Sequence, residues 1–275
     1  MQMILDSLWR ALRDCFRGKV IAWSLFPLLL MALMVAILGG LWWGSALGAV
    51  QHWLEQAGWL QPLWAWMGSV GAGSASAVAA GVLIVLIATP VIVVVALGVV
   101  AVVMTPRMVA LVAQQRFPTL ERKHGGNWFS SALWAMACTA IALVALLLSV
   151  PLWLVPPLVL ILPPLIGGWL TYRIMAYDAL AEHASQAERQ LLLEQHRYRL
   201  LLMGVICGFV GAAPSVIWAS GIVFAAAFWL LIPVGVWMYA LVFAFSSLWF
   251  AHYGLAALQQ LRGKKAETPT AVTPS

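Results

Sequence analysis

Hydrophobic residues run along this chain in long blocks, which short clusters of basic residues separate. Each block is long enough for two membrane passes, at about 20 residues a pass. Basic residues in short loops remain on the cytoplasmic side, so each block should leave the cytoplasm and return as a hairpin. The clusters, which hold every Lys and Arg of the chain, are Arg10/Arg13/Arg17/Lys19, Arg107/Arg116/Arg122/Lys123, Arg173/Arg189/Arg197/Arg199 and Arg262/Lys264/Lys265. The pattern predicts an all-α polytopic membrane protein, with six hydrophobic helical segments in three hairpins and both termini in the cytoplasm.

The six segments are expected to form a single membrane domain over residues 1–262. Residues 1–19 alternate apolar and basic positions at helical spacing, which predicts an amphipathic helix on the inner membrane surface. Segments 105–130 and 178–199 are expected to be cytoplasmic, and the polar tail 263–275 to be disordered. The predicted helical legs cover about 20–43, 78–104, 131–150, the return up to 172, 200–217 and 221–250.

The return leg of the middle hairpin carries an unusual number of prolines. Pro151, Pro156, Pro157, Pro163 and Pro164 are expected to leave no uninterrupted helical run of about 17 residues, the minimum for a membrane pass. Proline removes a backbone donor and breaks or kinks a helix. Two interpretations stay open: the hairpin crosses the bilayer, or it penetrates only part of it from the inner side. The same two interpretations stay open for the last hairpin.

Composition agrees with a membrane protein and explains the net charge. Hydrophobic residues make up 64% of the chain and charged residues 9%, whereas soluble domains carry about 25% charged residues. The net charge of +6 is accounted for by basic loops that face lipid headgroups. No basic stripe with interleaved aromatic residues occurs, so nucleic acid is not an expected partner. The expected partners are the lipid bilayer and a small inorganic anion, with a second copy of the chain left open.

No sequence motif of an enzyme is present. The chain has no HExxH, GxSxG or P-loop pattern. Asp178 and Glu182 lie one helical turn apart, but in a charged segment where a solvated face is the simpler interpretation. Cys15, Cys138 and Cys207 are too far apart along the chain to suggest a metal site or a redox motif. We therefore expect no catalytic activity, no metal and no cofactor.

Polar residues at the cytoplasmic ends of the apolar legs are the candidate anion site. Arg17, Gly18 and Lys19 directly precede the first leg, where the free N–H groups of a helix start and two cations suit an oxyanion. The alternative is a basic anchor for the first helix. Arg107 follows the second leg, and Arg173 lies four residues before Tyr177 and five before Asp178. These four residues could form a secondary cationic and polar set. Snorkelling of Arg173 to the interface is the simpler alternative.

The layout of the chain resembles that of the CysZ-like, etoposide-induced membrane protein family. The features shared over about 10–260 are Arg17-Gly18-Lys19 before Phe26-Pro27-Leu28-Leu29, a long second leg ending in Thr105-Pro106, and two proline-interrupted hairpins joined by a charged segment that opens with Tyr177-Asp178. Members of the family place a Gly-Leu-Arg motif at a sulfate site before the first helix. Gly18 and Lys19 fall at the corresponding place, with Lys19 directly after Gly18, so this chain resembles a divergent member.

The resemblance implies a multi-pass permease of the bacterial inner membrane that carries a small oxyanion such as sulfate. It also implies that Arg17, Gly18 and Lys19 bind the anion. A different class of function is compatible with the same residues. A scaffold or assembly factor that does not transport would use its basic cytoplasmic face and the 178–199 segment to bind a protein partner or anionic lipid.

Overall fold

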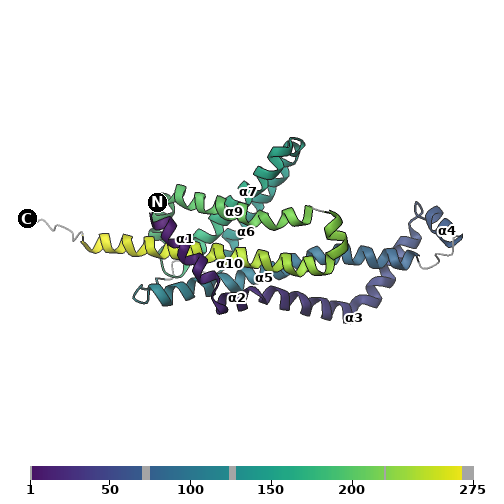
Figure 1. Ribbon diagram of the computed structural model, residues 1–275, viewed down its shortest axis with the longest axis horizontal. Coiled ribbons are helices and arrows are strands. Elements are labelled where there is room, and N and C mark those ends of the chain that lie inside the picture. Colours follow the sequence, from purple (N-terminus) through teal and green to yellow (C-terminus); the bar gives the residue numbers. More distant parts are fainter. Residues whose placement is uncertain (1, 70–74, 124–127, 220, 268–275) are drawn as a thin grey trace, which may run out of the picture. The chain divides into compact units, whose positions relative to one another are not determined.

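All regular structure in the described part of the chain is helical (Figure 1). The computed structural model describes residues 2–69, 75–123, 128–219 and 221–267. The elements are α1 (Gln2–Cys15), α2 (Gly18–Ser24), α3 (Phe26–Gln56), α4 (Gln61–Ser69), α5 (Ala75–Arg116), α6 (Trp128–Ser149), the 3-10 helix η1 (Val150–Leu154), α7 (Pro156–Ala181), α8 (Gln186–Gln195), α9 (Arg197–Ala219) and α10 (Gly221–Glu267). The predicted all-α class is confirmed.

Several of these helices are long and apolar enough to cross a membrane. Among the described residues five candidate spans occur: Gly18–Gln56, Ala75–Arg116, Phe129–Leu154, Pro156–Ala181 and Leu231–Lys264. A polytopic membrane protein is therefore the correct class, while the count of six segments stays a prediction.

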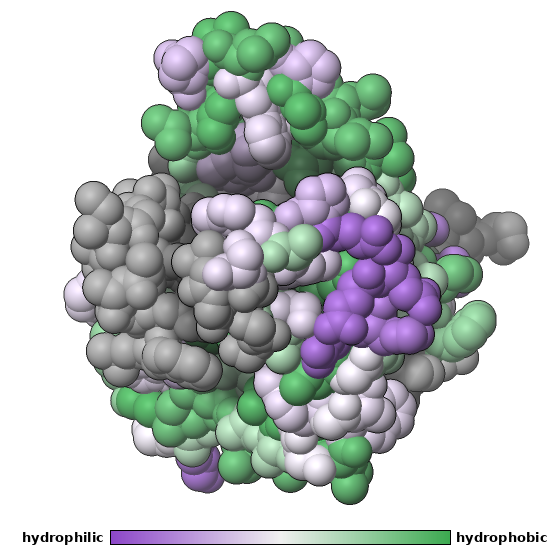
Figure 2. All heavy atoms as spheres, turned by 90° about the vertical axis from the view of Figure 1, so that its right-hand side faces the viewer, coloured by the Kyte–Doolittle hydropathy of each residue, from purple (hydrophilic) through white to green (hydrophobic). Residues whose placement is uncertain are grey.

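Apolar side chains on these helices face outward. At most 39% of the apolar window of any candidate span is buried within the protein. Figure 2 shows apolar residues over much of one face, with the largest group of strongly hydrophilic residues in one patch. Exposed apolar surface on this scale indicates contact with lipid, since soluble proteins rarely expose large continuous apolar patches.

Contacts divide the chain into two compact units. The main unit comprises Met1–Ser24 and Ala101–Ser275, and the hairpin unit comprises Leu25–Val100. The single membrane domain over 1–262 stays a prediction.

The hairpin unit contains α3, α4 and the first part of α5. Near the end of α3, Gln51 Nε2 donates to Glu55 Oε1 at 2.9 Å. Ser76 Oγ, at the start of α5, donates to the same oxygen at 2.8 Å and so links α5 to α3. Trp64 Nε1 donates to the Leu54 carbonyl at 3.0 Å and holds α4 against α3. The unit thus has a polar closure at its α4 end.

The prolines of the middle hairpin do not prevent a continuous helix, so the expectation that they would is wrong. Pro151 lies in η1, and Pro156 and Pro157 begin α7, where the missing N–H groups would have no helical partner in any case. Pro163 and Pro164 lie inside α7, which continues to Ala181. Its 26 residues correspond to about 39 Å, more than the hydrocarbon thickness of about 30 Å. Length therefore permits a crossing, although the crossing itself stays a prediction.

A close backbone contact joins α7 to α9 in the main unit. A Cβ added to Gly168 would lie 2.7 Å from the Gly204 carbonyl oxygen, and one added to Gly208 would lie 2.7 Å from the Gly168 Cα. The Pro164 carbonyl also approaches Gly208. Such an approach excludes any side chain at these glycines, and small residues four apart are typical of tightly packed membrane helices.

The segment 178–199, which was predicted to be cytoplasmic, contains the end of α7, all of α8 and the start of α9. The side chain of Ser185 accepts from the Glu188 N–H at 3.2 Å, and the Glu188 carboxylate accepts from the Ser185 N–H at 2.9 Å. This capping box starts α8 after α7 has ended. The buried residues Leu180, Ala184, Leu192, Ala257 and Leu258 form a core that fixes α8 against α10.

Two helices continue into segments that were expected to be non-helical or cytoplasmic. Helix α5 runs through Arg116, well into the predicted loop 105–130, and α10 runs through Glu267, into the predicted disordered tail 263–275. Residues 124–127 and 268–275 lie outside the described residues. On which side of the membrane these segments lie stays a prediction.

Candidate functional site

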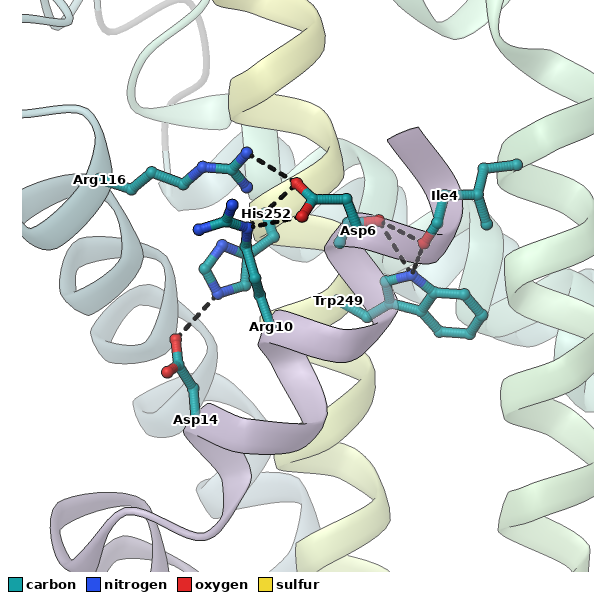
Figure 3. A network of polar contacts seen from close by, with 8 residues as sticks. Ile4, Asp6, Arg10, Asp14, Arg116, Trp249 and His252 are labelled. Carbon is teal, nitrogen blue, oxygen red and sulfur yellow. Dashed lines mark hydrogen bonds and ion pairs between the residues drawn. The ribbon is translucent and has the colours of Figure 1, made fainter. Parts of the chain in front are cut away.

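Helix α1 is fixed to α10 by polar contacts in the interior of the main unit (Figure 3). Trp249, whose side chain is fully buried, donates through Nε1 to the Ile4 carbonyl at 3.3 Å and to Ser7 Oγ at 3.2 Å. Further along α1, His252 Nε2 lies 3.0 Å from Asp14 Oδ2, and both side chains are buried. These contacts determine the position of the chain that leads to the predicted anion site.

A second group of charges links α1 to α5. Asp6 accepts from Arg10 Nε at 3.0 Å and from Arg116 Nη2 at 3.1 Å (Figure 3). Arg10 and Arg116 therefore share one carboxylate, which occupies donors of both guanidinium groups and balances one of their two charges. Arg13, one turn before Arg17, is exposed and has no charged partner among the described residues.

The predicted anion-binding residues Arg17, Gly18 and Lys19 are all exposed, at the junction of α1 and α2. Arg17 is already engaged: its Nε lies 3.1 Å from Asp14 Oδ1, and its Nη1 donates to Gln115. The carbonyl of Arg17 accepts from the Val20 N–H at 2.9 Å and from the Ile21 N–H at 3.0 Å. The groups left for an oxyanion are the Gly18 and Lys19 N–H and the Lys19 ammonium, which has no ion pair among the described residues. Gly18 has open space where a Cβ would stand.

Arg107 is brought to α2 by an aromatic contact. Its Cζ lies 4.1 Å from the ring centroid of Trp23, a cation–π distance. Trp237 of α10 donates to the Ser24 hydroxyl at 3.0 Å and holds the end of α2. The structure thus places Arg107 beside the helix that Gly18 and Lys19 begin.

The predicted secondary residues Arg173, Tyr177 and Asp178 gather around Trp134 of α6. Arg173 Cζ lies 4.6 Å from the Trp134 ring centroid, and the Tyr177 ring stacks on Trp134 with centroids 5.7 Å apart. Tyr177 donates to the Ser130 hydroxyl at 3.3 Å, and Asp178 has a hydrogen bond with Ser131. The three predicted residues do share a network, through α6. No contact described for them reaches Arg17, Gly18 or Lys19.

Arg262, near the end of α10, belongs to a cluster of charges around Glu188. Arg262 donates to both carboxylate oxygens of Glu188, at 3.1 and 3.0 Å, and to the backbone carbonyls of Glu121 and His183. Lys123 lies 3.5 Å from Glu188, completing a cluster that joins the α5–α6 connection, α8 and α10. The hydrogen bond from Arg262 is the main cause that lowers the pKa of Glu188 from 4.5 to about 2. The guanidinium of Arg262 is thus engaged by acceptors of the protein itself.

One pocket with basic residues was not predicted from the sequence. It has a volume of about 340 Å³ and lies between α7, α8 and α9. Trp169, Tyr172 and Arg173 line it from α7, with Glu194 and Arg197 opposite. Sequence reasoning identified Arg173 but missed Trp169 and Arg197, because only the break between α8 and α9 turns Arg197 toward α7. The one signal in the sequence was the pairing of Tyr172 with Arg173 at a helix end.

Within the described residues, no group of three or more His, Cys, Asp or Glu side chains lies close enough to hold a metal ion.

Comparison with known families identifies the chain, whereas no curated protein and no solved structure matches it significantly. The model of the family described as sulfate transporter CysZ/etoposide-induced protein 2.4 matches residues 7–220. That range contains α2 with Gly18 and Lys19, Arg107 of α5, and the α6–α7 hairpin with its Trp134 network. With most of its length matched, this chain belongs to the sulfate transporter CysZ/etoposide-induced protein 2.4 family.

Proposed function

We propose that this protein is a permease for a small tetrahedral oxyanion such as sulfate, in the bacterial inner membrane with both termini in the cytoplasm. The family carries the description of a sulfate transporter, which supports an anionic substrate. The observation that supports the site is that Lys19 is an exposed cation with no carboxylate partner among the described residues, next to Gly18, whose backbone is open.

In this proposal the anion enters at Arg17, Gly18 and Lys19. The ammonium of Lys19 supplies the full charge, and the backbone N–H groups of Gly18 and Lys19 supply directional donors. Arg17, which Asp14 and Gln115 hold in place, contributes through its remaining donors. Arg107, which lies over Trp23 of the same short helix, is a second cation in this proposal. Charge-assisted hydrogen bonds are stronger than neutral ones, so this set would compensate the lost hydration of a dianion.

The residues around Trp134 form the secondary set in the same proposal. Arg173 provides a cation in the second half of α7, while Tyr177 and Asp178 hold this part of the helix against α6 through Ser130 and Ser131. Transport through these residues requires no bound nucleotide or cofactor.

Uptake of radiolabelled sulfate by cells that lack their own sulfate carriers tests the proposal. Cells that express the protein should accumulate sulfate, and Lys19→Ala should reduce the initial rate about tenfold, the loss of one charge-assisted hydrogen bond. Arg13→Ala is the matched control, because Arg13 is equally exposed one turn earlier and has no assigned role. It should transport like the wild type.

Two results would contradict the proposal. If Lys19→Ala and Arg17→Ala both transport at the wild-type rate, the anion site is elsewhere. If the wild-type protein reaches the membrane but gives no uptake above background, a scaffold without transport activity becomes the better account.

A further inference from the structure

The pocket between α7, α8 and α9 has properties that a site for free sulfate would not need. Its volume of about 340 Å³ is several times that of a single tetrahedral oxyanion. Its walls are largely aromatic or aliphatic, from Trp169, Tyr172, Leu193 and Leu201. A bare dianion would gain little from such walls, so the occupant should combine an oxyanion with further atoms.

Two guanidinium groups at this pocket have no carboxylate partner. Neither Arg173 nor Arg197 forms an ion pair with any described residue, in contrast to Arg17, Arg122 and Arg262. The Nε of Arg173 is buried and has no hydrogen-bond partner within the protein. Buried donors are almost always satisfied in native proteins, and this one belongs to a guanidinium group that lines the pocket. A ligand with acceptor oxygens in the pocket would satisfy donors of Arg173 that the described residues leave unpaired.

The guanidinium of Arg173 is also held in position. Its Cζ lies 4.6 Å from the Trp134 ring centroid and 5.8 Å from that of Trp169. Two aromatic neighbours restrict the rotation of the side chain, which reduces the entropy lost on binding. Arginine of this kind suits bidentate contact with phosphate oxygens.

Glu194 makes the pocket zwitterionic. Its carboxylate lines the same space and has no ion pair among the described residues. It would repel a plain anion but would attract an ammonium group carried by the same ligand. Two guanidinium groups and one carboxylate therefore match a phosphate that is joined to an amine.

Helix α9, whose first residue lines the pocket, also exposes apolar side chains that suit acyl chains. Helix α9 begins at Arg197, and Leu202, Ile206, Phe209 and Val210 are exposed along one of its faces. Trp169 and Tyr172 lie at the pocket, and indole and phenol rings favour the headgroup level of a bilayer. From these observations together we propose that the pocket binds the headgroup of a phospholipid such as phosphatidylethanolamine. Its phosphate lies on Arg173 and Arg197, its ammonium on Glu194, and its acyl chains along α9.

The test measures lipid retained by the purified full-length protein. Delipidated protein is titrated with phosphatidylethanolamine, phosphatidylglycerol or phosphatidylcholine, and bound lipid is counted by native mass spectrometry. The wild type should retain one phosphatidylethanolamine, and Arg197→Ala should weaken that binding about tenfold, the value of one charge-assisted contact. Arg13→Ala, which removes one exposed guanidinium elsewhere, should retain the lipid as the wild type does.

A second variant separates the ammonium contact from the phosphate contact. Glu194→Gln should reduce binding of phosphatidylethanolamine while it leaves phosphatidylglycerol, which has no amine, unchanged or stronger. Unchanged retention in Arg197→Ala, or an equal loss in Arg13→Ala, would overturn the assignment of the pocket. Displacement of the lipid by inorganic sulfate or phosphate at millimolar concentration, with the same dependence on Arg197, would instead make this a free-anion site.

This inference does not depend on transport. Arg173 has a place in both proposals, as a secondary cation for transport and as a phosphate ligand here. The two tests use different residues, Arg197 for lipid binding and Lys19 for sulfate uptake, so either can fail while the other holds.

Discussion

Glycines spaced four residues apart occur on two helices of this protein, with opposite structural results. On α9, Gly204 and Gly208 lie so close to α7 that no Cβ could be added without displacing backbone atoms. On α3 of the hairpin unit, Gly40, Gly44 and Gly48 have the same spacing, yet a Cβ at any of them would meet no described atom within 4 Å. The same short motif therefore forms a backbone contact in one unit and leaves open surface in the other.

The difference lies in the partner helix rather than in the motif. Helix α7 offers Gly168 and the Pro164 carbonyl to α9, so two backbones can approach each other and exchange Cα–H···O contacts. In the hairpin unit, the glycine of α5 that faces α3 is Gly81. A Cβ added to Gly81 would lie 3.9 Å from side-chain atoms of Leu47 and Trp43. Large side chains there keep the backbones apart. A small-residue motif thus produces close packing only where the facing helix also carries small residues at the point of contact.

Valine substitutions at the two kinds of glycine give the largest expected contrast. Gly208→Val should destabilise the protein by about 3 kcal/mol, because the branched side chain collides with the backbone of α7 and the helices must separate. Gly44→Val, the matched control on α3, should change stability by less than about 0.5 kcal/mol, since valine has space there and a better helix propensity than glycine. Thermal unfolding in detergent, followed by tryptophan fluorescence, measures both. Equal losses in the two variants would contradict the comparison.

The charge cluster of the main unit gives a second contrast, which depends on pH. Because the pKa of Glu188 is lowered to about 2, its ion pair stabilises the folded state fully above pH 4.5 and progressively less as the pH falls toward 2. The shift corresponds to on the order of 3 kcal/mol. Stability should therefore fall over this range in the wild type.

A variant at the same position assigns that fall to Glu188. Glu188→Gln cannot titrate, so its unfolding free energy should change less between pH 5 and pH 3 than that of the wild type. Asp6→Asn serves as the control, since Asp6 is an exposed carboxylate in another ion-pair group and should leave most of the decline in place. Parallel pH profiles for the wild type and Glu188→Gln would refute this assignment.

The polar closure of the hairpin unit should give the smallest effect. Ser76→Ala removes one donor to Glu55 but leaves the hydrogen bond from Gln51, so we expect a loss of about 0.5–1 kcal/mol. Hydrogen exchange of the α3–α5 end would detect it as faster local opening. A loss as large as that of Gly208→Val would show that this end is as tightly constrained as the α7–α9 crossing.

Parts of the fold could be predicted because their causes are local in the sequence. Long apolar blocks require helices in a membrane, since no water is present to satisfy the backbone, and basic clusters marked where those blocks end. The break between α7 and α8 was missed although the capping residues Ser185 and Glu188 have the spacing of a capping box. The effect of the prolines was overestimated, because Pro156 and Pro157 begin a helix instead of ending one.

The candidate site, too, could be predicted from the sequence only in part. Arg173, Tyr177 and Asp178 lie one turn apart, so their grouping was visible in the sequence, whereas Trp134 as their common neighbour was not. The sequence also could not show which cation has a carboxylate partner. Arg17 and Lys19 are both basic residues before the first leg, and of these two only Arg17 is paired with Asp14 in the structure.

The sequence by itself determined that this protein is helical and built for a membrane, because hydrophobicity and charge act locally on each segment. The tertiary structure alone decided which glycines touch, which arginines are neutralised and which are left at a pocket. Those outcomes depend on pairs of residues far apart in the chain, such as Gly168 with Gly204 or Glu188 with Arg262, and the pattern of one segment carries no information about its partner.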